Sequence, residues 1–498
     1  MMGISMRQHA LSLTVSAPVK GWMDSENIAA MNAASAIRLD NWFPETDRVR
    51  LRRGYNVYAT GLGTAAVEAL MDYAAGGSRK LLAAANGKIY DITNGSVVEL
   101  ASGFSSNRWQ HVNVNNRLIM VNGVDAPQIY DGTSLSAMSI TGSGLSVSSL
   151  IGVNLFKGRL YFTQQNSLKF WYLPVNAIAG TAVSFDLSFM CRLGGSLQAI
   201  GTWTRDGGDG ADDIIVFITD RGEVLLYDGA DPSSATDWSL IGVFRVGAPV
   251  GRRCLIKAGG DLGVIVEDGF LPLNQVLPYD RGVAQKLAIS SAITNNLNEA
   301  VRLYKGNFGW QAVPYPRGHM LLFNIPTREG IESQQYVMNS LSGAWCRFTG
   351  MNAACWTIFE DKLYFGGMDG RVYLADNGYH DNGAAIMGDM KTAFNYAPPR
   401  QKLKRFTLCR PLLSSDGNPS FSLDAQVDFD DSTSLSVFSS PSATGTASWD
   451  NVNWDIADWA GLAETARNWL AINGLGYAVS LRLRLQTSSL EAAISAYL

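Results

Sequence analysis

The chain has 498 residues, of which 47% are hydrophobic and only 17% are charged, and it carries 50 glycines and a formal net charge of −4. This length allows two to four domains of about 100–200 residues each. A charged fraction below the usual value of about 25%, combined with abundant glycine, is typical of a β-rich protein with many tight turns. It excludes a disordered chain, a coiled coil and a basic protein that wraps nucleic acid.

The cysteines and the apolar segments bear on the cellular environment. The five cysteines include no CxxC pair, which indicates a reducing compartment and thiols that behave as small apolar residues. No run of about 18 apolar residues occurs, so the sequence predicts no membrane segment. The apolar stretch Ala10–Val19 contains too many Ser and Thr residues to resemble the core of a signal peptide.

The first predicted strand lies near the N-terminus and has one basic face. Arg48, Arg50 and Arg52 alternate there with Val49 and Leu51. Successive side chains of a strand point to opposite sides, so the three arginines share one face.

A hairpin pattern then recurs along most of the chain. Each copy is an apolar strand, a turn of Gly, Asn or Asp, and a second strand that ends near an aromatic residue, often with an Asp. The copies are Leu81–Asp91, Leu118–Asp131, Arg159–Leu173, Ile214–Asp228, Leu262–Leu273, Met320–Asn339 and Lys362–Asp376. Four closing tyrosines, Tyr90, Tyr130, Tyr172 and Tyr227, are 40, 42 and 55 positions apart.

A strand-pair unit that repeats every 40–55 residues is typical of a β-propeller blade. Each blade buries its faces only against its neighbours, so six or seven copies that close a ring are the expected solution. An array of β-sandwiches or a solenoid is the alternative. The Ser- and Gly-rich segment 133–152 is interpreted as a long exposed connection between blades.

One helix interrupts this pattern near 284–304. Ile293, Leu297, Val301 and Tyr304 recur there at helical spacing. We expect this apolar stripe to pack on the propeller, and recognition of a partner is the alternative.

The C-terminal part again has basic strands. Lys402 and Lys404 share a face of a candidate strand that continues to Cys409, and Arg482 and Arg484 alternate with leucines. Between them, residues 411–466 contain nine acids and no Lys or Arg, together with Trp449, Trp454 and Trp459. These tryptophans are interpreted as packing anchors, with a sugar-stacking platform as the alternative.

The expected fold class is therefore mainly all-β, with a propeller of about six or seven blades, an inserted helix and a second β-rich platform domain. The platform is expected to take its strands from both chain ends, residues 1–60 and 380–498, with the propeller at 61–379. The seven basic residues are either solvated or in ion pairs with the acidic segment, or they contact a neighbouring subunit or phosphate.

No catalytic constellation is recognisable in the sequence. It contains no GxSxG, GxGxxG, GxxxxGK[ST] or HExxH motif, and its four histidines are scattered. We therefore predict no enzyme activity, no catalytic residue, no cofactor and no metal site. The acidic cluster Asp206–Asp213 does not have EF-hand spacing and is interpreted as an exposed turn, with a Ca²⁺ site as the alternative. Asp91, Asp131 and Asp228 are interpreted as turn caps, with a binding site as the alternative.

Several segments resemble the tail nozzle or tail hub proteins of short-tailed bacteriophages, also called packaged-DNA stabilisation proteins. They are Ala36–Glu45 (AIRLDNWFPE), Val49–Tyr55 (VRLRRGY), Trp310–Pro326, Tyr336–Gly350 (YVMNSLSGAWCRFTG) and Leu363–Gly378 (LYFGGMDGRVYLADNG). The resemblance spans the chain from about Ala36 to Tyr477. These segments are strand-and-turn patterns, so the resemblance implies no catalytic residues.

The resemblance implies a structural subunit of the virion tail that is made in the host cytoplasm. Such subunits form rings, usually hexamers, that extend the portal and the head-to-tail adaptor ring and attach tail fibres or spikes. The ring retains packaged double-stranded DNA and conducts it during ejection without reading its sequence. We accordingly expect Arg48, Arg50, Arg52, Lys402, Lys404, Arg482 and Arg484 to lie at subunit contacts or near the channel.

Two other functions remain open at this stage. One is a propeller that binds or cleaves glycans at its axis, which convergent carboxylates and stacked aromatics around a pocket would support. The other is a monomeric propeller scaffold for protein partners.

Overall fold

The computed structural model describes residues 12–204, 213–417, 419–430, 437–438, 464–466 and 469–498. The chain forms two compact units. The propeller unit comprises residues 53–340 and 348–382, and the platform unit comprises residues 1–52, 341–347 and 383–498. The domain limits expected from the sequence were 60 and 379, without the short excursion at 341–347.

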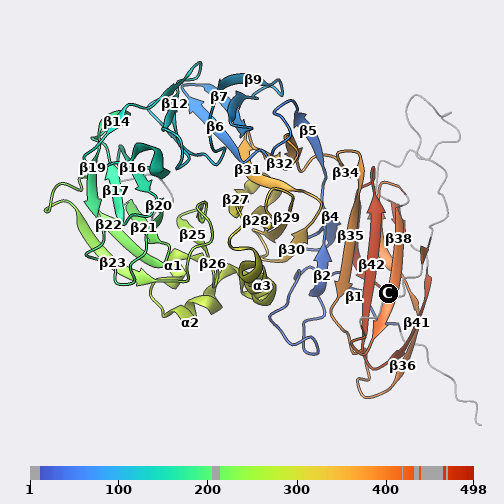
Figure 1. Cartoon of the computed structure of the whole chain (residues 1–498). Coiled ribbons are helices and arrows are strands. Elements are labelled where there is room, and N and C mark those ends of the chain that lie inside the picture. The colour runs from blue at the N-terminus through green and yellow to red at the C-terminus, as the bar shows by residue number, and fades with distance from the viewer. Residues whose placement is uncertain (1–11, 205–212, 418, 431–436, 439–463, 467–468) are drawn as a thin grey trace, which may run out of the picture. The chain divides into compact units, whose positions relative to one another are not determined.

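The propeller unit contains seven antiparallel groups of strands arranged as the blades of a ring (Figure 1). Blades 1 to 5 are separate sheets, whereas the strands of blades 6 and 7 belong to one 14-stranded sheet. The first four blades have four strands each. Blade 1 is β6 (Ala69–Ala75), β7 (Ser78–Ala85), β8 (Lys88–Asp91) and β9 (Val98–Ser102), and blade 2 is β10 (Gln110–Val114), β11 (Arg117–Val121), β12 (Gln128–Tyr130) and β13 (Leu135–Ala137). Blade 3 is β15 (Leu150–Phe156), β16 (Arg159–Gln164), β17 (Lys169–Tyr172) and β19 (Val183–Asp186), and blade 4 is β20 (Leu197–Trp203), β21 (Ile214–Thr219), β22 (Glu223–Asp228) and β23 (Ser239–Arg245).

The last three blades are less uniform. Blade 5 is β24 (Leu255–Ala258), β25 (Asp261–Val266) and β26 (Gly269–Pro272). Blade 6 is β27 (Gln311–Tyr315), β28 (Met320–Arg328) and β29 (Glu332–Asn339). Blade 7 is β31 (Ala353–Phe359), β32 (Lys362–Gly367) and β33 (Val372–Ala375), and β5 (Tyr55–Ala59) is its fourth strand. The expected propeller is thus confirmed, with seven blades.

Blade 7 closes the ring by joining the two ends of the propeller segment. Strand β5 pairs antiparallel with β33, with Tyr55 opposite Ala375 and Ala59 opposite Val372. The Tyr55 ring makes edge-on contacts with Phe365 and Tyr373, each with centroids 5.1 Å apart. This pairing places 53–60 in the propeller unit.

Each of the seven hairpins recognised in the sequence forms the second and third strands of one blade. The four spaced tyrosines occupy β8, β12, β17 and β22, the third strands of blades 1 to 4, and all four are buried. The segment 133–152 is not one long connection, because it contains β13, the short β14 (Ile140–Thr141) and a 3₁₀ turn at Val147–Ser149. Strand β14 pairs in parallel with β18 (Gly180–Thr181).

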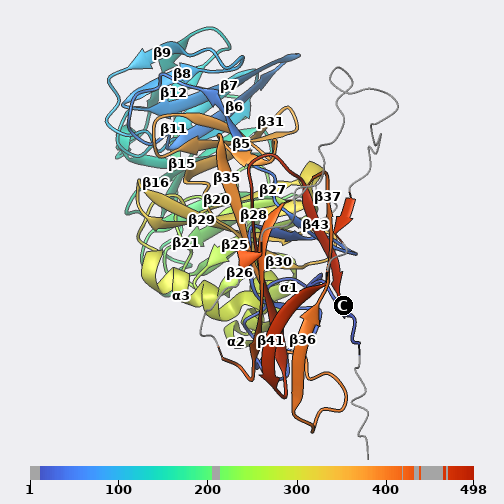
Figure 2. The ribbon, with the colours of Figure 1, turned by 90° about the vertical axis from the view of Figure 1, so that its right-hand side faces the viewer.

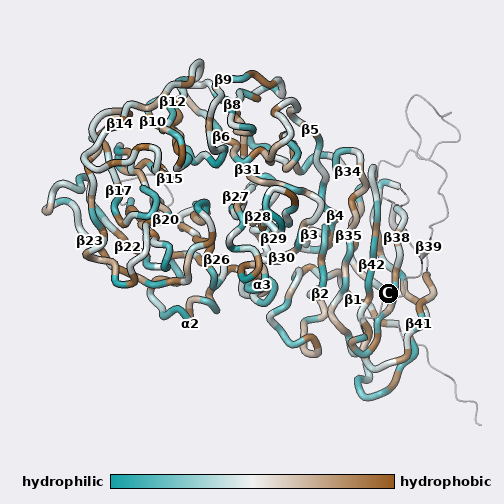
Figure 3. The backbone as a smooth tube through the Cα atoms, in the orientation of Figure 1, coloured by the Kyte–Doolittle hydropathy of each residue, from teal (hydrophilic) through white to brown (hydrophobic). Residues whose placement is uncertain are grey.

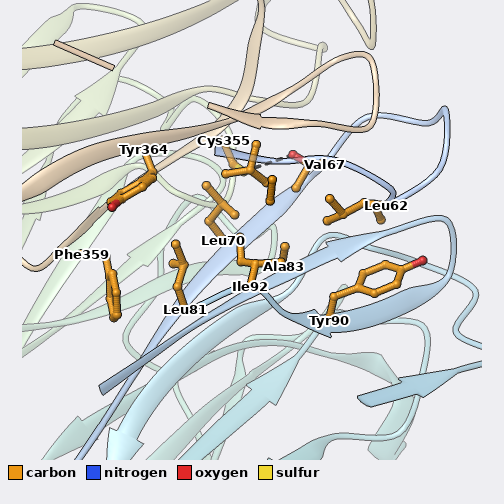
Figure 4. Packing of buried hydrophobic residues seen from close by; sticks show 13 residues of the cluster. Leu62, Val67, Leu70, Leu81, Ala83, Tyr90, Ile92, Cys355, Phe359 and Tyr364 are labelled. Carbon is orange, nitrogen blue, oxygen red and sulfur yellow. Dashed lines mark hydrogen bonds between the residues drawn. The ribbon is translucent and has the colours of Figure 1, made fainter. Parts of the chain in front are cut away.

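The blades bury both of their faces against neighbouring blades. On β7, Leu81 and Ala83 pack toward blade 7, whereas Leu82 and Ala84 pack toward blade 2. Figure 4 shows the first of these clusters, in which the Cys355 thiol also donates a hydrogen bond to the Val67 carbonyl at 3.1 Å. A strand that is buried on both sides is apolar along its whole length, which explains the run LLAAA at 81–85.

The helices lie between blades 5 and 6 in the sequence. They are α1 (Leu273–Val276), α2 (Arg281–Ala284) and α3 (Thr294–Tyr304), with 3₁₀ turns at Gln285–Leu287 and Ile289–Ile293. Leu297 and Val301 of α3 are buried, and α3 packs against β28 and β26 of the propeller. The stripe therefore packs on the propeller, as expected from its spacing.

The platform unit is built mainly from two β-sheets. One contains β2 (Ala36–Asp40), β35 (Ala384–Thr392), β42 (Val479–Thr487), β38 (Ser420–Val427) and β39 (Val437–Phe438). The other contains β1 (Val15–Ser16), β3 (Trp42–Pro44), β4 (Val49–Leu51), β43 (Ala492–Tyr497), β37 (Pro411–Ser415) and β40 (Glu464–Ala466). Strand β30 (Trp345–Phe348) pairs in parallel with β2 through Arg347 and Asp40.

The two platform sheets touch through a glycine. A Cβ atom on Gly388 of β35 would lie 2.5 Å from Trp42 Nε1 and 2.7 Å from Leu51 Cδ1, so a larger residue would push the sheets apart. Beside the first sheet, β36 (Lys404–Cys409) and β41 (Leu470–Gly476) form a two-stranded ribbon, drawn in orange and red in Figure 2. Strand β41 of this ribbon packs against β38.

A substitution in the Asn86–Gly87 turn of blade 1 tests whether a glycine is required for this hairpin turn. Both residues have positive φ, 51° and 68°, and a Cβ atom on Gly87 would lie 2.5 Å from the Phe104 carbonyl oxygen. We expect Gly87→Ala to destabilise the protein by about 2–3 kcal/mol, since backbone strain and a backbone clash add together. Chemical unfolding followed by tryptophan fluorescence measures the effect.

Gly77→Ala is the matched control, because Gly77 also has a positive φ, 96°, but nothing lies within 4 Å of its added Cβ. Its expected cost is only about 1 kcal/mol. Equal costs for the two variants would contradict the role assigned to the Phe104 contact.

Candidate functional site

The seven basic residues predicted from the sequence all belong to the platform unit. Arg48 and Arg50 on β4 share one carboxylate. Arg48 Nε donates to Glu45 Oε2 at 2.7 Å, and Arg50 Nε donates to Glu45 Oε1 at 2.9 Å. Burial acts to raise the pKa of Glu45, but the hydrogen bonds and charges of Arg48 and Arg50 outweigh it and hold the pKa below its usual value.

Arg52 has an internal role. Its side chain is 1% exposed, and its Nε donates to Asn41 Oδ1 at 2.8 Å. The Asn41 side chain in turn donates to the Met387 carbonyl of β35 at 2.8 Å. Arg52 therefore ties the two platform sheets together, and its guanidinium is not available to a neighbouring subunit or a channel.

Arg482 and Arg484 converge with Arg38 on a single acid, Asp389 of β35. Arg482 makes a bidentate pair with Asp389, with Nε–Oδ1 and Nη2–Oδ2 distances of 3.0 and 2.7 Å. Arg484 Nε and Arg38 Nη1 each lie 3.3 Å from Asp389 Oδ2. The sheet register explains the convergence, since β42 lies beside β35 and places Arg484 opposite Asp389.

The Asp389 cluster (Asp389, Arg38, Arg482 and Arg484) combines a buried pair with a positive surface. Burial acts to raise the pKa of Asp389, but the arginines outweigh it and lower the pKa. The Arg482 side chain is 5% exposed, whereas those of Arg484 and Arg38 are 35% and 44% exposed. Arg482 is therefore structural, and Arg484 and Arg38 present positive charge to the surroundings.

The two lysines lie at the start of the ribbon. Lys402 is exposed, and Lys404 Nζ donates to the carbonyls of Lys402 and Tyr477 at 3.0 and 3.4 Å. Of the seven predicted residues, Arg48, Lys402, Lys404 and Arg484 thus keep part of their charge accessible. Arg48 and Arg50 pair with Glu45, and Arg482 and Arg484 pair with Asp389, both outside the acidic segment 411–466. One acid of that segment, Asp424, lies opposite Arg482 in the β38–β42 pair. Burial raises the pKa of Asp424, although the charge of Arg482 acts to lower it.

A second surface feature was not recognised in the sequence. The outward face of the β36–β41 ribbon, called here the ribbon face, consists of the exposed residues Arg405, Thr407, Leu408, Ala471, Asn473 and Leu475. Arg405 lies opposite Leu475 and Leu408 lies opposite Ala471, and a register shift between Phe406 and Leu408 turns Leu408 outward. Leu408 and Leu475 are 56% and 61% exposed.

Further large apolar side chains flank the ribbon face. Leu403, Trp469 and Tyr477 are all exposed, and the Arg410 guanidinium lies 5.0 Å from the Trp469 ring centroid. Within the described residues, β36 and β41 pair only with each other, so each has an unpaired edge. Exposed apolar side chains beside unpaired strand edges are typical of a surface that contacts another chain.

The acidic residues of the propeller act as turn caps. Asp91 accepts hydrogen bonds from Thr93 N, Asp131 from Thr133 N and Ser134 N, and Asp228 from Gly229 N. Within Asp206–Asp213, residues up to 212 lie outside the described residues, and Asp213 is buried directly before β21. Among the described residues, no group of three His, Cys, Asp or Glu is placed to hold a metal ion.

In the described part of the chain, no helix has the length and hydropathy needed to cross a membrane, and the cysteines are free thiols. The cysteines form no disulfide, and Cys254, Cys346, Cys355 and Cys409 are buried. Burial raises the pKa of the Cys254 thiol to about 12.

Comparisons with known proteins give no family for this chain. No family model matches it, and no curated protein matches it in sequence. Among solved structures, it is similar to the computationally designed protein Ika8, with 11% identity, a TM-score of 0.38, and coverage of 68% of this chain and 96% of that one. It is also similar to PorZ, a surface component of the type-IX secretion system of Porphyromonas gingivalis, with 12% identity, a TM-score of 0.38, and coverage of 71% and 44%. BamB from Moraxella catarrhalis matches with 11% identity, a TM-score of 0.34, and coverage of 70% and 98%.

Asp389→Asn tests the buried pair. The variant removes the bidentate carboxylate partner of the buried Arg482, and breaking a buried ion pair typically costs about 3 kcal/mol. Because the folded-state pKa of Asp389 is lowered, its stabilisation is complete above the unfolded carboxyl pKa of about 3.9 and is lost as the pH falls through the folded pKa. Urea unfolding between pH 3 and pH 7 should therefore show a smaller acid-dependent loss in the variant.

Glu299→Gln serves as the control for this experiment. Glu299 pairs with Arg302 at 4.0 Å, and the two side chains are 64% and 71% exposed, so its removal should change the unfolding free energy little. If Asp389→Asn were no more destabilising than Glu299→Gln, the Asp389 cluster would not have a structural role.

Proposed function

We propose that this protein is a ring-forming structural subunit of a short-tailed phage tail, a nozzle or hub that retains packaged DNA and conducts it during ejection. The observation that carries the proposal is the ribbon face of the platform unit, which exposes Leu408 and Leu475 and, among the described residues, has unpaired strand edges. The resemblance of five sequence segments to tail nozzle proteins supplies the biological setting.

Self-association through the ribbon face has a physical basis. Burying an exposed Leu side chain is worth about 1.5–3 kcal/mol, and the ribbon face offers Leu408 and Leu475 on adjacent strands. A neighbouring strand could also add to the unpaired edge of β36 or β41. Contact between one such surface and a different surface of the next subunit generates a ring when the rotation closes.

In this proposal the DNA passes between subunits and not through the propeller axis. The first strands of the blades and their side chains line a cavity of only about 290 Å³ at the axis of each propeller. A duplex whose major groove alone is about 12 Å wide does not fit such a space. The residues proposed to lie near the channel or at subunit contacts are those with accessible charge: Arg48, Lys402, Lys404 and Arg484. Contacts with the adaptor ring and with tail fibres are proposed to lie elsewhere on the ring.

The glycan-active alternative lacks a supporting observation. Glycoside hydrolysis ordinarily uses two carboxylates beside the scissile bond. The residues that line the axial cavity include two arginines and no Asp or Glu among the described residues. We therefore do not favour the glycan-active alternative. The monomeric scaffold differs from the ring in particle mass, which the next experiment measures.

Leu408→Asp and Leu475→Asp test the role of the ribbon face. Each variant puts a charge on a surface that the proposal buries between subunits, so the ring should dissociate to monomers or assemble at least tenfold more weakly. Size-exclusion chromatography with light scattering gives the particle mass, and negative-stain images with purified adaptor complex show whether an axial channel is present.

Leu303→Asp is the matched control, because Leu303 is also an exposed leucine, 51%, but lies on α3 of the propeller unit. It should leave the particle mass unchanged. A wild-type protein that stays monomeric even with adaptor complex would refute the ring, and rings that survive both ribbon substitutions would show that subunits associate through another surface.

A further inference from the structure

The propeller unit contains a polar cavity at its axis that the proposed structural function does not use. Its volume is about 290 Å³, near the lower end of the range of small-molecule sites. Residues from β6, β10, β15, β20, β24, β27 and β31 line it, so the first strand of every blade contributes. Figure 1 shows these blades arranged around the axis.

Two arginines of the segment between blades 4 and 5, Arg252 and Arg253, line this cavity. Arg252 Nη1 donates to the Asn122 carbonyl at 3.2 Å. Arg253 Nη2 donates to the carbonyls of Glu68 and Trp109 at 2.8 and 3.2 Å. All three acceptors are neutral, and in the described part of the chain no carboxylate lies within 4.0 Å of either guanidinium.

The charges of the described residues around these arginines do not balance them. Arg108 lies nearby, and its guanidinium and that of Arg253 lie 4.3 and 5.1 Å from the Phe308 ring centroid. Arg108 already pairs with both Glu68 and Glu329, at 3.0 and 2.7 Å. In the described part of the chain, three arginines therefore face two glutamates, which leaves one positive charge in excess.

The remaining titratable group of the lining is His111, whose Nε2 lies 3.3 Å from Asp72 Oδ1. Burial lowers the pKa of Arg252, and the charge of Arg108 lowers it further. Burial also lowers the pKa of Arg253, although the charge of Glu68 acts to raise it. For both arginines the loss of water therefore outweighs the counter-charge that the described residues supply.

Two polar atoms at the cavity also have no partner. Both atoms, Arg253 Nη1 and Thr163 Oγ1, are shielded from solvent. Among the described residues, Arg253 Nη1 donates no hydrogen bond and Thr163 Oγ1 takes part in none. Thr163 is 1% exposed and lines the cavity. Gly152 faces it, since a Cβ atom there would lie 3.3 Å from Thr163 Oγ1 and 3.4 Å from Gln110 Oε1, so the glycine keeps this space open.

We propose that the axial cavity is a binding site for a small oxyanion, a phosphate or carboxylate group of a small molecule, held by Arg252, Arg253 and Thr163. A buried cation is stable only when it is paired, and a guanidinium pairs best with the two oxygens of a carboxylate or phosphate. The Thr163 hydroxyl would donate the third hydrogen bond. This site is independent of the ring proposed above, because it lies within a single propeller unit.

Isothermal titration calorimetry of the whole chain tests the site with sodium phosphate, sodium acetate and sodium chloride at equal ionic strength. We expect phosphate or acetate to bind, and chloride to give no saturable signal. Whichever oxyanion binds more tightly identifies the ligand class. The absence of saturable binding by both oxyanions would refute the proposal.

The variants separate this site from general salt effects, which stabilise proteins without occupying a site. Arg252→Gln should weaken oxyanion binding at least about tenfold, because it removes a charge-assisted contact. Thr163→Val should weaken it as well, and it removes a hydroxyl that makes no hydrogen bond, so it should fold normally. Arg302→Gln, on exposed α3, is the control and should bind like the wild type.

Equal oxyanion affinity in the wild type, Arg252→Gln and Thr163→Val would overturn the assignment of the site. Should Arg252→Gln fail to fold, Thr163→Val against Arg302→Gln decides the question alone. Neither outcome depends on whether the protein assembles into rings.

Discussion

The propeller depends on one constraint, that every blade must bury both of its faces against its neighbours. Strand β7 shows this directly, since its alternate residues Leu81 and Leu82 enter different interblade clusters. Figure 3 shows how hydrophobic and hydrophilic stretches alternate along the blades. A blade at an open end would leave one face in water, so the ring must close. Strand β5 closes it by completing blade 7 from the opposite end of the segment.

The same closure explains where the units meet in the sequence. Because β5 belongs to blade 7, the chain must enter the propeller before residue 55, and the platform unit takes its strands from residues on both sides of the propeller segment. Within the platform unit, buried arginines connect neighbouring strands. Arg482 reaches Asp389 across a strand pair, and Arg52 reaches Asn41. Each has a specific partner, so its burial costs less than that of an isolated charge.

Charge is treated differently at the two candidate functional places. In the platform unit, Glu45 and Asp389 gather the arginines, and Arg484 and Arg38 remain partly exposed. At the propeller axis, Arg252 and Arg253 have only neutral acceptors among the described residues. The first arrangement stabilises a fold and leaves a positive surface. The second leaves, among the described residues, an excess positive charge that a bound oxyanion would balance. Because of this contrast, we assign separate functions to the platform arginines and to the axial cavity.

The sequence alone determined the repeat. All seven hairpins and the buried tyrosines of blades 1 to 4 follow from local patterns of apolar residues and turn residues. The one helix expected near 284–304 is confirmed only for Thr294–Tyr304, because 3₁₀ turns occupy Gln285–Leu287 and Ile289–Ile293. The outer strands were missed, because β9, β13 and β19 are short and mostly exposed and so have no apolar alternation. Turn chemistry also predicted the capping roles of Asp91, Asp131 and Asp228.

Only the tertiary structure decided the sites. Arg48, Arg50 and Arg52 have the same spacing in the sequence, yet Arg48 is exposed and Arg52 is buried. Some partners are distant in the chain, since Arg38 and Arg482 lie 351 and 93 positions from Asp389, whereas Arg48 and Arg50 pair with the nearby Glu45. The axial cavity draws one strand from every blade, so no local pattern could indicate it. The low overall charge of the chain was visible at once, but the places where charge is paired or left in excess are properties of the folded ring and of the strand register.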